Sequence, residues 1–332
     1  MDLSRVNNLL VIRLSSLGDI LLTTPLVRSI KKQYPQISIS FMLKEQYKNL
    51  LKYNPNLSEV YLYKKEFSTQ KNIQLNGLKS KKFDLIIDLQ NNFRSNALSL
   101  KLGAPVKRFK KKNFYKLLLV YLKINRLRNE PPIPERYSRV LKNFELDEEG
   151  LDLFMPDAIS SKLSDDKKYV GFAPGSRHFT KMWPKKYFTD LGNFLGKSGI
   201  TVVLFGGKDD METCRVISDE ISGSINLCNN DDIFETAVNM KKCSALICND
   251  SGMMHVSCAL KIPVIAIFGS TVEEFGFAPY KNKNIILENG NLSCRPCSHI
   301  GKEACPKKHF KCMTEITPLI AFNKLKLLLE SR

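Results

Sequence analysis

Apolar runs with the length of β-strands alternate with helical stretches in both halves of this chain. In the first half the expected strands are residues 9–14, 37–43 and 83–89. In the second half they are residues 169–173, 201–205, 245–248, 264–268 and 284–287. Strands that are joined through helices form parallel sheets with helices on their faces. We therefore expect an α/β fold built from two Rossmann-like, doubly wound parallel sheets.

The length of the chain fits two such domains. At 332 residues it is long for one hydrophobic core, and domains of about 150 residues are common. A Pro-containing, acidic stretch at residues 145–166 precedes the first strand of the second half. We place the boundary there, which gives an N-terminal domain of residues 1–155 and a C-terminal domain of residues 156–316. Residues 317–332 begin with Thr-Pro and are expected to form a capped C-terminal helix.

One carboxylate follows the first strand directly. In the run VIRLSSLGDILLTTP (residues 11–25), a strand ends in small polar residues and a helix begins near Ser15 or Ser16. Gly18 leaves room for a bound molecule, and Asp19 falls in the first helical turn. This position suits a catalytic base. It equally suits a capping pair, in which Asp19 only accepts a backbone N–H near the helix start.

Strands of the second half end in small or polar residues, at the place where a doubly wound sheet offers a ligand crevice. These ends are residues 174–176, 206–207, 250–252 and 269–271. Backbone N–H groups at helix starts there suit a diphosphate. Lys181 adds a positive charge, although a single lysine is usually only solvated. The chain has no GxGxxG turn after its first strand and no GxxxxGK[ST] motif, which argues against a dinucleotide dehydrogenase and a P-loop ATPase.

Several of these residues also have a simpler structural explanation. Thr271 and Glu274 form a capping-box pattern, which predicts that a helix starts at Thr271. Ser251 is an expected helix cap, and Asp250 can share that role. His255, five residues after Asp250, can be a hydrogen-bonded helix histidine that touches no ligand.

Positive charge is concentrated in the first half. Residues 1–150 hold 28 Lys and Arg against 13 Asp and Glu, whereas residues 151–332 hold 23 against 20. Residues 101–128 carry ten basic residues, no acidic one, and several aromatic and aliphatic side chains. Such a segment suits anionic lipid headgroups, a phosphorylated glycan or nucleic acid, or it is a solvated basic face without a partner. No nucleic-acid-binding motif accompanies it, so nucleic acid is the weaker interpretation.

Four motifs, far apart in the sequence, occur together in one order. They are SSLGD with TTP (residues 15–19 and 23–25), DLQNNFRS (residues 88–95), KMWP (residues 181–184) and DSGMMH (residues 250–255). With them the chain resembles bacterial glycosyltransferase family 9, the ADP-heptose:lipopolysaccharide heptosyltransferases, and especially the heptosyltransferase II branch. The resemblance extends over nearly the whole chain. The chain differs from the family pattern in Ser251, where threonine is frequent, and in Asn91 and Asn92, where a glycine is frequent.

The resemblance implies the GT-B fold, in which an N-terminal domain binds the acceptor and a C-terminal domain binds the sugar nucleotide across a cleft. It implies an inverting transfer of heptose from ADP-L-glycero-β-D-manno-heptose to the inner core of lipid A-anchored lipopolysaccharide. Asp19 would be the general base, and Lys181 would stabilise the departing ADP without a metal cofactor. The implied donor-binding residues are Ser176, Lys181, Gly206, Gly207, Asp250, Ser251, Gly252, His255, Ser270 and Thr271. The implied acceptor-binding residues are Ser15, Ser16, Gly18, Gln90 and Arg94.

Four of the nine cysteines lie close together near the C-terminus. Cys294, Cys297, Cys305 and Cys312 follow a Cys-x2-Cys-x7-Cys-x6-Cys pattern, with two histidines among them. This pattern is typical of a structural zinc site. Free thiols or a disulfide are the alternatives.

Two further classes of function fit the same residues. One is another enzyme of this fold, either a transferase that uses a different nucleotide sugar or a nucleotide-sugar epimerase. The other is a non-catalytic protein that binds anions or glycans. The chain opens with Met-Asp and no basic segment, and its apolar runs are too short to cross a bilayer. We expect a cytoplasmic protein that binds peripherally to the anionic inner face of the inner membrane.

Overall fold

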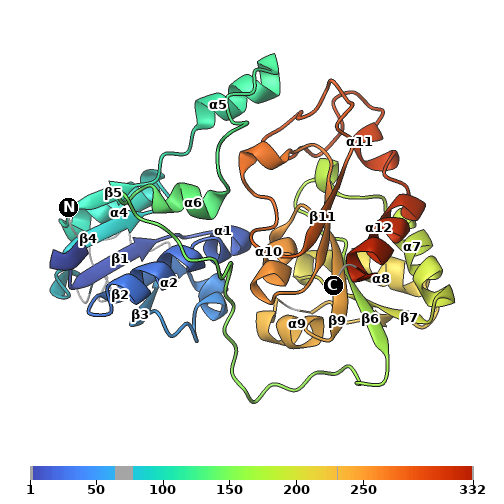
Figure 1. Cartoon of the computed structure of the whole chain (residues 1–332), viewed down its shortest axis with the longest axis horizontal. Coiled ribbons are helices and arrows are strands. Elements are labelled where there is room, and N and C mark those ends of the chain that lie inside the picture. The colour runs from blue at the N-terminus through green and yellow to red at the C-terminus, as the bar shows by residue number, and fades with distance from the viewer. Residues whose placement is uncertain (1–2, 64–77, 230, 331–332) are drawn as a thin grey trace. The chain divides into compact units, whose positions relative to one another are not determined.

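The computed structural model describes residues 3–63, 78–229 and 231–330 (Figure 1). Its internal contacts divide the chain into two compact units. Unit 1 comprises Met1–Lys112 and Pro131–Pro156, and unit 2 comprises Asn113–Glu130 and Asp157–Arg332. The chain thus contributes a segment to unit 2 before it returns to complete unit 1. The assignment of acceptor and donor to separate domains stays a prediction.

Unit 1 is built on a five-stranded parallel sheet with the order β3-β2-β1-β4-β5. Its strands are β1 (Asn8–Ile12), β2 (Ser38–Lys44), β3 (Glu59–Tyr63), β4 (Leu85–Asp88) and β5 (Val106–Arg108). The apolar run NLLVI forms β1, which is buried almost throughout because strands lie on both sides of it. The end of this central strand leads directly to Asp19.

Short helices precede, connect and follow these strands. They are η1 (Leu3–Arg5), α1 (Leu17–Leu21), α2 (Thr24–Gln33), η2 (Glu45–Leu50), α4 (Phe93–Leu102) and α6 (Ile133–Ser138). Leu98 of α4 packs in one core cluster with Leu10 and Ile12 of β1 and Ile86 of β4. The turns that carry the predicted acceptor-binding residues are therefore fixed to a buried sheet.

Arg28 of α2 holds the returning segment of unit 1 in place. Its buried guanidinium donates through Nη2 to Asp147 at 2.5 Å and to the carbonyl oxygen of Gly150 at 2.8 Å, and it also pairs with Asp152. The hydrogen bond from Arg28 lowers the pKa of Asp147 below its ordinary value. The two acidic side chains stabilise the fold only while they are ionised.

We expect Arg28→Ala to destabilise unit 1 by about 3 kcal/mol, because two carboxylates lose their buried partner. Hydrogen exchange should rise in peptides from α2 and from residues 145–152. Lys32→Ala removes more exposed pairs with Glu149 and Asp147 and leaves the buried Arg28 in place, so it should change exchange much less. In the native protein, the stabilisation that Arg28 gives through Asp147 is complete above the pKa of an unfolded Asp, about 4. It is lost as the pH falls through the lowered pKa of Asp147 in the folded protein. Unchanged exchange in Arg28→Ala would argue against this role.

Unit 2 contains a six-stranded parallel sheet with the order β11-β10-β9-β6-β7-β8. Its strands are β6 (Lys168–Ala173), β7 (Ile200–Leu204), β8 (Ile225–Asn226), β9 (Cys243–Asn249), β10 (Val264–Phe268) and β11 (Asn284–Glu288). Both units have a doubly wound order, with strands added on either side of the first strand. The expectation of two Rossmann-like parallel sheets is confirmed.

Helices cover both faces of this second sheet (Figure 1). The helices and helical turns of unit 2 are α5 (Asn113–Leu117), η4 (Leu118–Leu122), η5 (Phe179–Lys181), α7 (Lys185–Lys197), η6 (Lys208–Asp210), α8 (Met211–Asp219), α9 (Ile233–Met240), α10 (Gly252–Ala259), η7 (Glu273–Phe275), α11 (Lys311–Thr314) and α12 (Pro318–Glu330). Leu191 of α7, Ile217 of α8 and Leu325 of α12 share one core with the strands. Helices α9 and α10 contact β9. The predicted C-terminal helix is α12.

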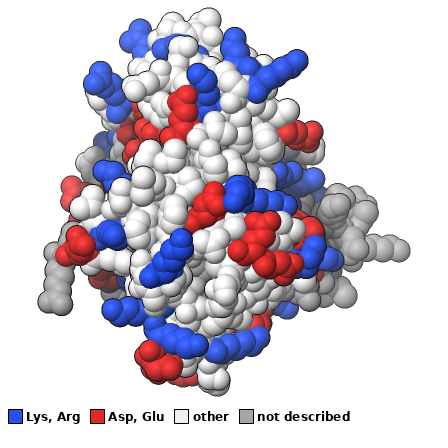
Figure 2. Space-filling view, turned by 90° about the vertical axis from the view of Figure 1, so that its right-hand side faces the viewer, with Lys and Arg blue, Asp and Glu red and all other residues white. Residues whose placement is uncertain are grey.

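Charged side chains of both signs lie next to one another on the face drawn in Figure 2. No field of a single sign covers that face. Among the residues that the structure describes, no helix combines the length and the apolar character needed to cross a membrane.

Candidate functional site

Asp19 lies at the start of α1, just after the central strand of unit 1. Its oxygen Oδ2 accepts hydrogen bonds from the backbone N–H of Ser16 at 3.1 Å and from the Ser16 hydroxyl at 2.8 Å. These contacts are the capping pair that the sequence also allows. The other oxygen, Oδ1, lies 2.5 Å from Nη2 of Arg13. The carboxylate is thus held by a cation as well as by the helix start.

Arg13 keeps Asp19 ionised. The guanidinium is buried, donates to the carbonyl oxygen of Leu89 at 2.7 Å, and lies 5.8 Å from the ring centre of Tyr137. Burial alone would raise the pKa of Asp19, but Arg13 and the hydrogen bonds from Ser16 lower it below its ordinary value. The side chain of Asp19 is still 18% exposed. An ionised and accessible carboxylate can accept a proton.

Gln90 joins the loops that follow β1 and β4. Its side-chain oxygen accepts hydrogen bonds from the backbone N–H groups of Leu14 at 2.9 Å and Ser15 at 3.2 Å. Asp88, buried at the end of β4, accepts from the Gln90 N–H at 3.0 Å and from the Ser95 hydroxyl at 2.8 Å. The structure therefore brings Gln90 to the loop that carries Asp19, and it uses the Gln90 side chain to support that loop.

The remaining predicted acceptor-binding positions differ in their exposure. Gly18 is buried in α1, whereas Arg94 is exposed in the first turn of α4. No hydrogen bond or ion pair joins Arg94 to Asp19 within the described residues. Asn91 has a backbone φ of 39°, in the left-handed region that glycine favours and asparagine tolerates. Its conformation explains how asparagine can replace the frequent glycine, while Asn92 caps α4.

Unit 2 carries a second group, the Lys181 cluster, which consists of Lys181, Asp250 and Thr271. Lys181 ends η5 after β6, Asp250 follows β9, and Thr271 follows β10. Nζ of Lys181 lies 2.6 Å from Oδ2 of Asp250, and the Thr271 hydroxyl donates to the same oxygen at 2.6 Å. The side chains of Lys181 and Asp250 are 15% and 9% exposed. The ends of three parallel strands thus bring these residues together, as a doubly wound sheet predicts.

Thr271 does not begin a capped helix. The element that follows is the three-residue turn η7, and its cap residue is Val272. The Thr271 hydroxyl instead donates to the buried carboxylate of Asp250, and no described side chain caps that turn with a hydrogen bond. The capping-box prediction is therefore wrong.

Helix α10 begins at Gly252, and Ser251 is its cap residue, as predicted. The Ser251 hydroxyl oxygen is buried and has no hydrogen-bond partner among the residues that the structure describes. The first N–H groups of a helix lack partners within the helix, so they are available to an anionic group. His255 is buried farther along α10. This end of the helix can donate hydrogen bonds to a phosphate.

Gly206 and Gly207 allow close packing of acidic side chains. A Cβ atom on Gly206 would lie 2.6 Å from Cβ of Asp210, and one on Gly207 would lie 2.1 Å from Oδ1 of Asp231. The Gly207 N–H already donates to Asp210 at 3.0 Å. Burial raises the pKa of Asp210, and Asp231 adds to that effect. These carboxyl groups make the two glycines less suited to bind a diphosphate than the Lys181 cluster, which contains a lysine. The remaining predicted donor-binding residue, Ser176, follows β6 and is partly exposed.

Sequence reasoning gave no role to three polar residues that position these groups. Arg13 binds Asp19, and the Thr180 hydroxyl lies 3.0 Å from that of Ser270. The carbonyl of Thr180 also accepts the Ser270 N–H at 3.2 Å, so that predicted donor-binding amide is already occupied. The side chain of Asn249 accepts the backbone N–H of Trp183 at 2.9 Å. A polar residue within or beside an apolar run could have pointed to them, because a buried polar side chain needs a hydrogen-bond partner.

The structure gives no support for a metal site at the four C-terminal cysteines within the residues it describes. The described part of the chain has no group of three or more His, Cys, Asp and Glu side chains that could hold a metal ion. Sγ of Cys294 lies 3.8 Å from Nε2 of His309, and burial raises the pKa of Cys312 to about 11. The zinc site predicted for Cys294, Cys297, Cys305 and Cys312 is therefore not supported by the part of the chain that the structure describes.

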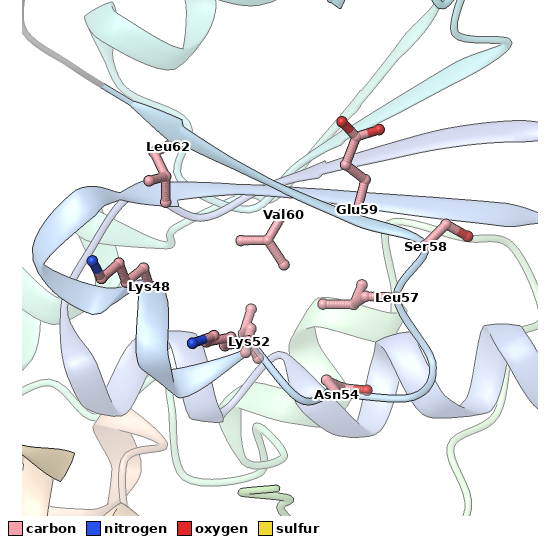
Figure 3. Close-up of a pocket in the computed structure, with 9 residues that line it drawn as sticks. Lys48, Lys52, Asn54, Leu57, Ser58, Glu59, Val60 and Leu62 are labelled. Carbon is pink, nitrogen blue, oxygen red and sulfur yellow. The ribbon is translucent and has the colours of Figure 1, made fainter. Parts of the chain in front are cut away.

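A cavity of about 350 Å³ lies in unit 1 between η2, the following loop and β3 (Figure 3). Leu57, Val60 and Leu62 give it an apolar wall, and Lys48 and Lys52 contribute positive charge. None of the predicted site residues lines this cavity. The chemistry-bearing groups lie instead at the ends of the central strands.

Comparison with known proteins gives a consistent family. The sequence profile of glycosyltransferase family 9 (heptosyltransferase) matches residues 75–308. Lipooligosaccharide heptosyltransferase 2 of Campylobacter jejuni subsp. jejuni serotype O:2 is 27% identical over 326 residues, covering 95% of this chain and 96% of the relative. Lipopolysaccharide heptosyltransferase 2 of Escherichia coli K12 is 25% identical over 293 residues, covering 80% and 84%.

Solved structures show the same fold. A glycosyl transferase family 9 protein from Veillonella parvula has a TM-score of 0.78 and 22% identity, with 98% of each chain covered. The E. coli ADP-heptose lps heptosyltransferase II has a TM-score of 0.75 and 24% identity, with 97% of this chain and 98% of that chain covered. The GT-B fold expected from the sequence motifs is confirmed.

Proposed function

This chain belongs to glycosyltransferase family 9, and we propose that it transfers heptose from ADP-L-glycero-β-D-manno-heptose to the inner core of lipid A-anchored lipopolysaccharide. The relatives named lipooligosaccharide or lipopolysaccharide heptosyltransferase 2 support this substrate class. The observation that carries the proposal is the ionised carboxylate of Asp19, which Arg13 and Ser16 hold at a strand-to-helix junction.

Asp19 acts as the general base. The attacking acceptor hydroxyl gives its proton to the Asp19 carboxylate while its oxygen forms a bond to the anomeric carbon of the heptose. On the opposite side of that carbon, the bond to the ADP oxygen breaks, and ADP leaves with the bonding electron pair. The anomeric configuration is therefore inverted. Arg13 favours the ionised carboxylate from which the reaction begins.

Lys181 and the start of α10 bind the donor diphosphate. Lys181 is paired with Asp250 in this structure, and a diphosphate attracts its ammonium group more strongly because it carries more negative charge. The Ser251 hydroxyl and the N–H of Gly252 add hydrogen bonds. The same groups stabilise the negative charge that develops on the departing ADP. The transfer step then needs no metal cofactor.

The acceptor binds around Asp19. Ser15, Ser16 and Gly18 belong to the same loop and first helical turn, and Gln90 supports them. Arg94 and the excess of Lys and Arg in residues 1–150 suit the phosphates and acidic sugars of a lipid A-anchored core. This charge distribution also favours peripheral binding to the anionic inner face of the inner membrane.

A comparison of nucleotide sugars tests the proposed donor. The purified protein would receive the acceptor with ADP-heptose, with other ADP-sugars, or with UDP- and GDP-sugars, and release of the nucleotide would be measured. We expect fastest turnover with ADP-heptose. Faster turnover of a different nucleotide sugar would identify another transferase of this fold, and donor binding without any turnover would indicate a non-catalytic binding protein.

Replacing Arg13 by Met should shift the pH dependence of turnover. Arg13 lowers the pKa of Asp19, so its removal raises that pKa. Since the base acts in its ionised form, activity is lost as the pH falls through that pKa. The acid side of the kcat profile should therefore move upward by about one pH unit or more. Arg13→Lys keeps the positive charge and should move it less, and an unmoved profile in Arg13→Met would contradict the assigned role.

A further inference from the structure

Residues 113–124, here called the arm, expose an unusual number of apolar side chains. The arm consists of α5, the π-helical turn η4 and two following residues, and it belongs to unit 2. Fifteen large apolar side chains are exposed among the described residues, and six of these lie in the arm. They are Phe114, Tyr115, Leu117, Tyr121, Leu122 and Ile124. Such a concentration marks an interaction surface.

The apolar side chains of the arm lie mainly on one side. Phe114, Leu117 and Tyr121 follow the i, i+3, i+7 spacing of a helical stripe, and they are 67%, 42% and 74% exposed. Leu119 and Val120 are buried on the opposite side. The arm therefore has two apolar faces, of which only one is covered by unit 2.

The covered face fastens the arm to unit 2. Leu119 and Val120 pack in a small core with Leu127 and Phe275. Lys123 is one of the basic residues of the arm, and it also attaches the arm to unit 2. Its ammonium group donates to the carbonyl oxygens of Pro296 at 2.7 Å and Cys294 at 3.1 Å. The exposed stripe is thus presented by a fixed element and not by a loose loop.

Positive charge flanks the exposed stripe. Three consecutive lysines, residues 110–112, precede the arm, and Arg126 and Arg128 follow it and are exposed. There is no acidic residue from position 89 to position 129. A second copy of this chain would bring the same positive charge to the same place, so self-association through this stripe is disfavoured. An anionic lipid surface matches both the apolar stripe and its charge.

We propose that the arm inserts Phe114, Leu117, Tyr121 and Leu122 into the interfacial region of an anionic phospholipid bilayer, while the flanking basic side chains contact headgroups. Tyrosine rings suit this boundary, since one end is apolar and the hydroxyl stays hydrated. The purpose of this docking rests on the proposed function, because a lipid-anchored acceptor is reached at a membrane surface. Insertion itself requires neither donor nor acceptor.

Vesicle binding tests the arm directly. The native protein and the variant Phe114→Ser/Leu117→Ser/Tyr121→Ser would be sedimented with vesicles of phosphatidylcholine, with and without phosphatidylglycerol and free of any glycolipid. We expect the native protein to bind the anionic vesicles, and the variant to lose roughly tenfold or more in affinity. The matched control is Leu319→Ser/Ile320→Ser/Leu327→Ser, which removes three exposed apolar side chains of α12 and should bind like the native protein.

The fluorescence of a tryptophan placed in the arm distinguishes insertion of the arm into the bilayer from electrostatic binding at the bilayer surface. The chain has a single tryptophan, Trp183, which is buried. In the variant Tyr121→Trp, we expect a blue shift of the added emission with anionic vesicles, and quenching by brominated lipid chains. Emission that is unchanged by vesicles would overturn the proposal, as would native-like binding of the triple arm variant.

Two further comparisons identify the source of the anionic groups and separate membrane docking from the proposed heptosyltransferase activity. Binding that occurs only when the vesicles contain the acceptor glycolipid would overturn docking to phospholipid. Turnover of a deacylated, soluble acceptor should be the same in the native protein and in the triple arm variant. If neither protein turns over that acceptor, the proposed function fails while the vesicle result still stands.

Discussion

Asp19→Asn is expected to bind ADP-heptose as the native protein does and to lose turnover by about 10³-fold or more. Asparagine keeps the size of the side chain, and its oxygen can still accept the N–H of Ser16, so the helix start is preserved. It cannot take a proton from the acceptor hydroxyl. Donor affinity measured by calorimetry and turnover measured by ADP release would separate binding from chemistry.

The matched control for this variant is Glu45→Gln, which removes an exposed carboxylate from the same unit. We expect it to leave both donor binding and turnover within about twofold of the native values, as is usual for surface changes. Thermal unfolding of Asp19→Asn should show whether the helix start survives. Native-like turnover in a folded Asp19→Asn protein would remove Asp19 from the role of base.

Lys181→Ala is expected to lower kcat by about 10²-fold and to weaken donor binding. The ammonium group faces Asp250 in this structure, and it is the cation of the cluster formed at the ends of β6, β9 and β10. Without it, neither the bound diphosphate nor the charge that develops on departing ADP is compensated at this position. Steady-state kinetics with saturating acceptor and varied ADP-heptose would give both effects.

Two variants show whether the effect is specific to this position. Lys186→Ala removes a highly exposed lysine of α7 that pairs with Asp190, and it should leave kcat nearly unchanged. Asp250→Asn removes the partner of Lys181 and should weaken donor binding less than Lys181→Ala does, because the positive charge remains. Equal kinetic constants for Lys181→Ala and Lys186→Ala would refute a role of Lys181 in binding the diphosphate.

The central strands could be predicted from the sequence because their side chains are buried on both faces. The apolar run VIAIF, for example, is β10 over Val264–Phe268, as expected. Strands β3, β5 and β8 were missed. Strands β5 and β8 are too short to form an apolar run, and β3 has one but is only partly buried. These strands join the sheet because a neighbouring strand offers backbone hydrogen bonds, which local sequence preference does not reveal.

The sequence did not predict that the chain passes between the two units more than once. Charge and proline content suggest a single division near residue 155, whereas the internal contacts group residues 113–130 with unit 2. That grouping depends on packing of Leu119, Val120 and Leu127 against Phe275. Apolar residues in the sequence show that a partner is needed, but they do not say which distant residue supplies it.

The candidate site was predictable in its residue types and less so in its partners. The motif around Asp19 predicts a carboxylate at a helix start, and the strand ends predict a cluster at the edge of the second sheet. Arg13 and Thr180 were missed because their partners depend on the tertiary structure. The zinc prediction is not supported by the described residues, because cysteine spacing in a sequence does not by itself determine the geometry that a metal ion requires.

The most direct measurement is ADP release by the purified protein from ADP-heptose, with and without a lipid A-anchored core acceptor that carries one heptose. Asp19→Asn would be measured alongside. We predict release that depends on the acceptor and disappears in the variant. Release by Asp19→Asn at the native rate would contradict the assigned base, and no release from native protein that binds ADP-heptose would contradict transfer to this acceptor.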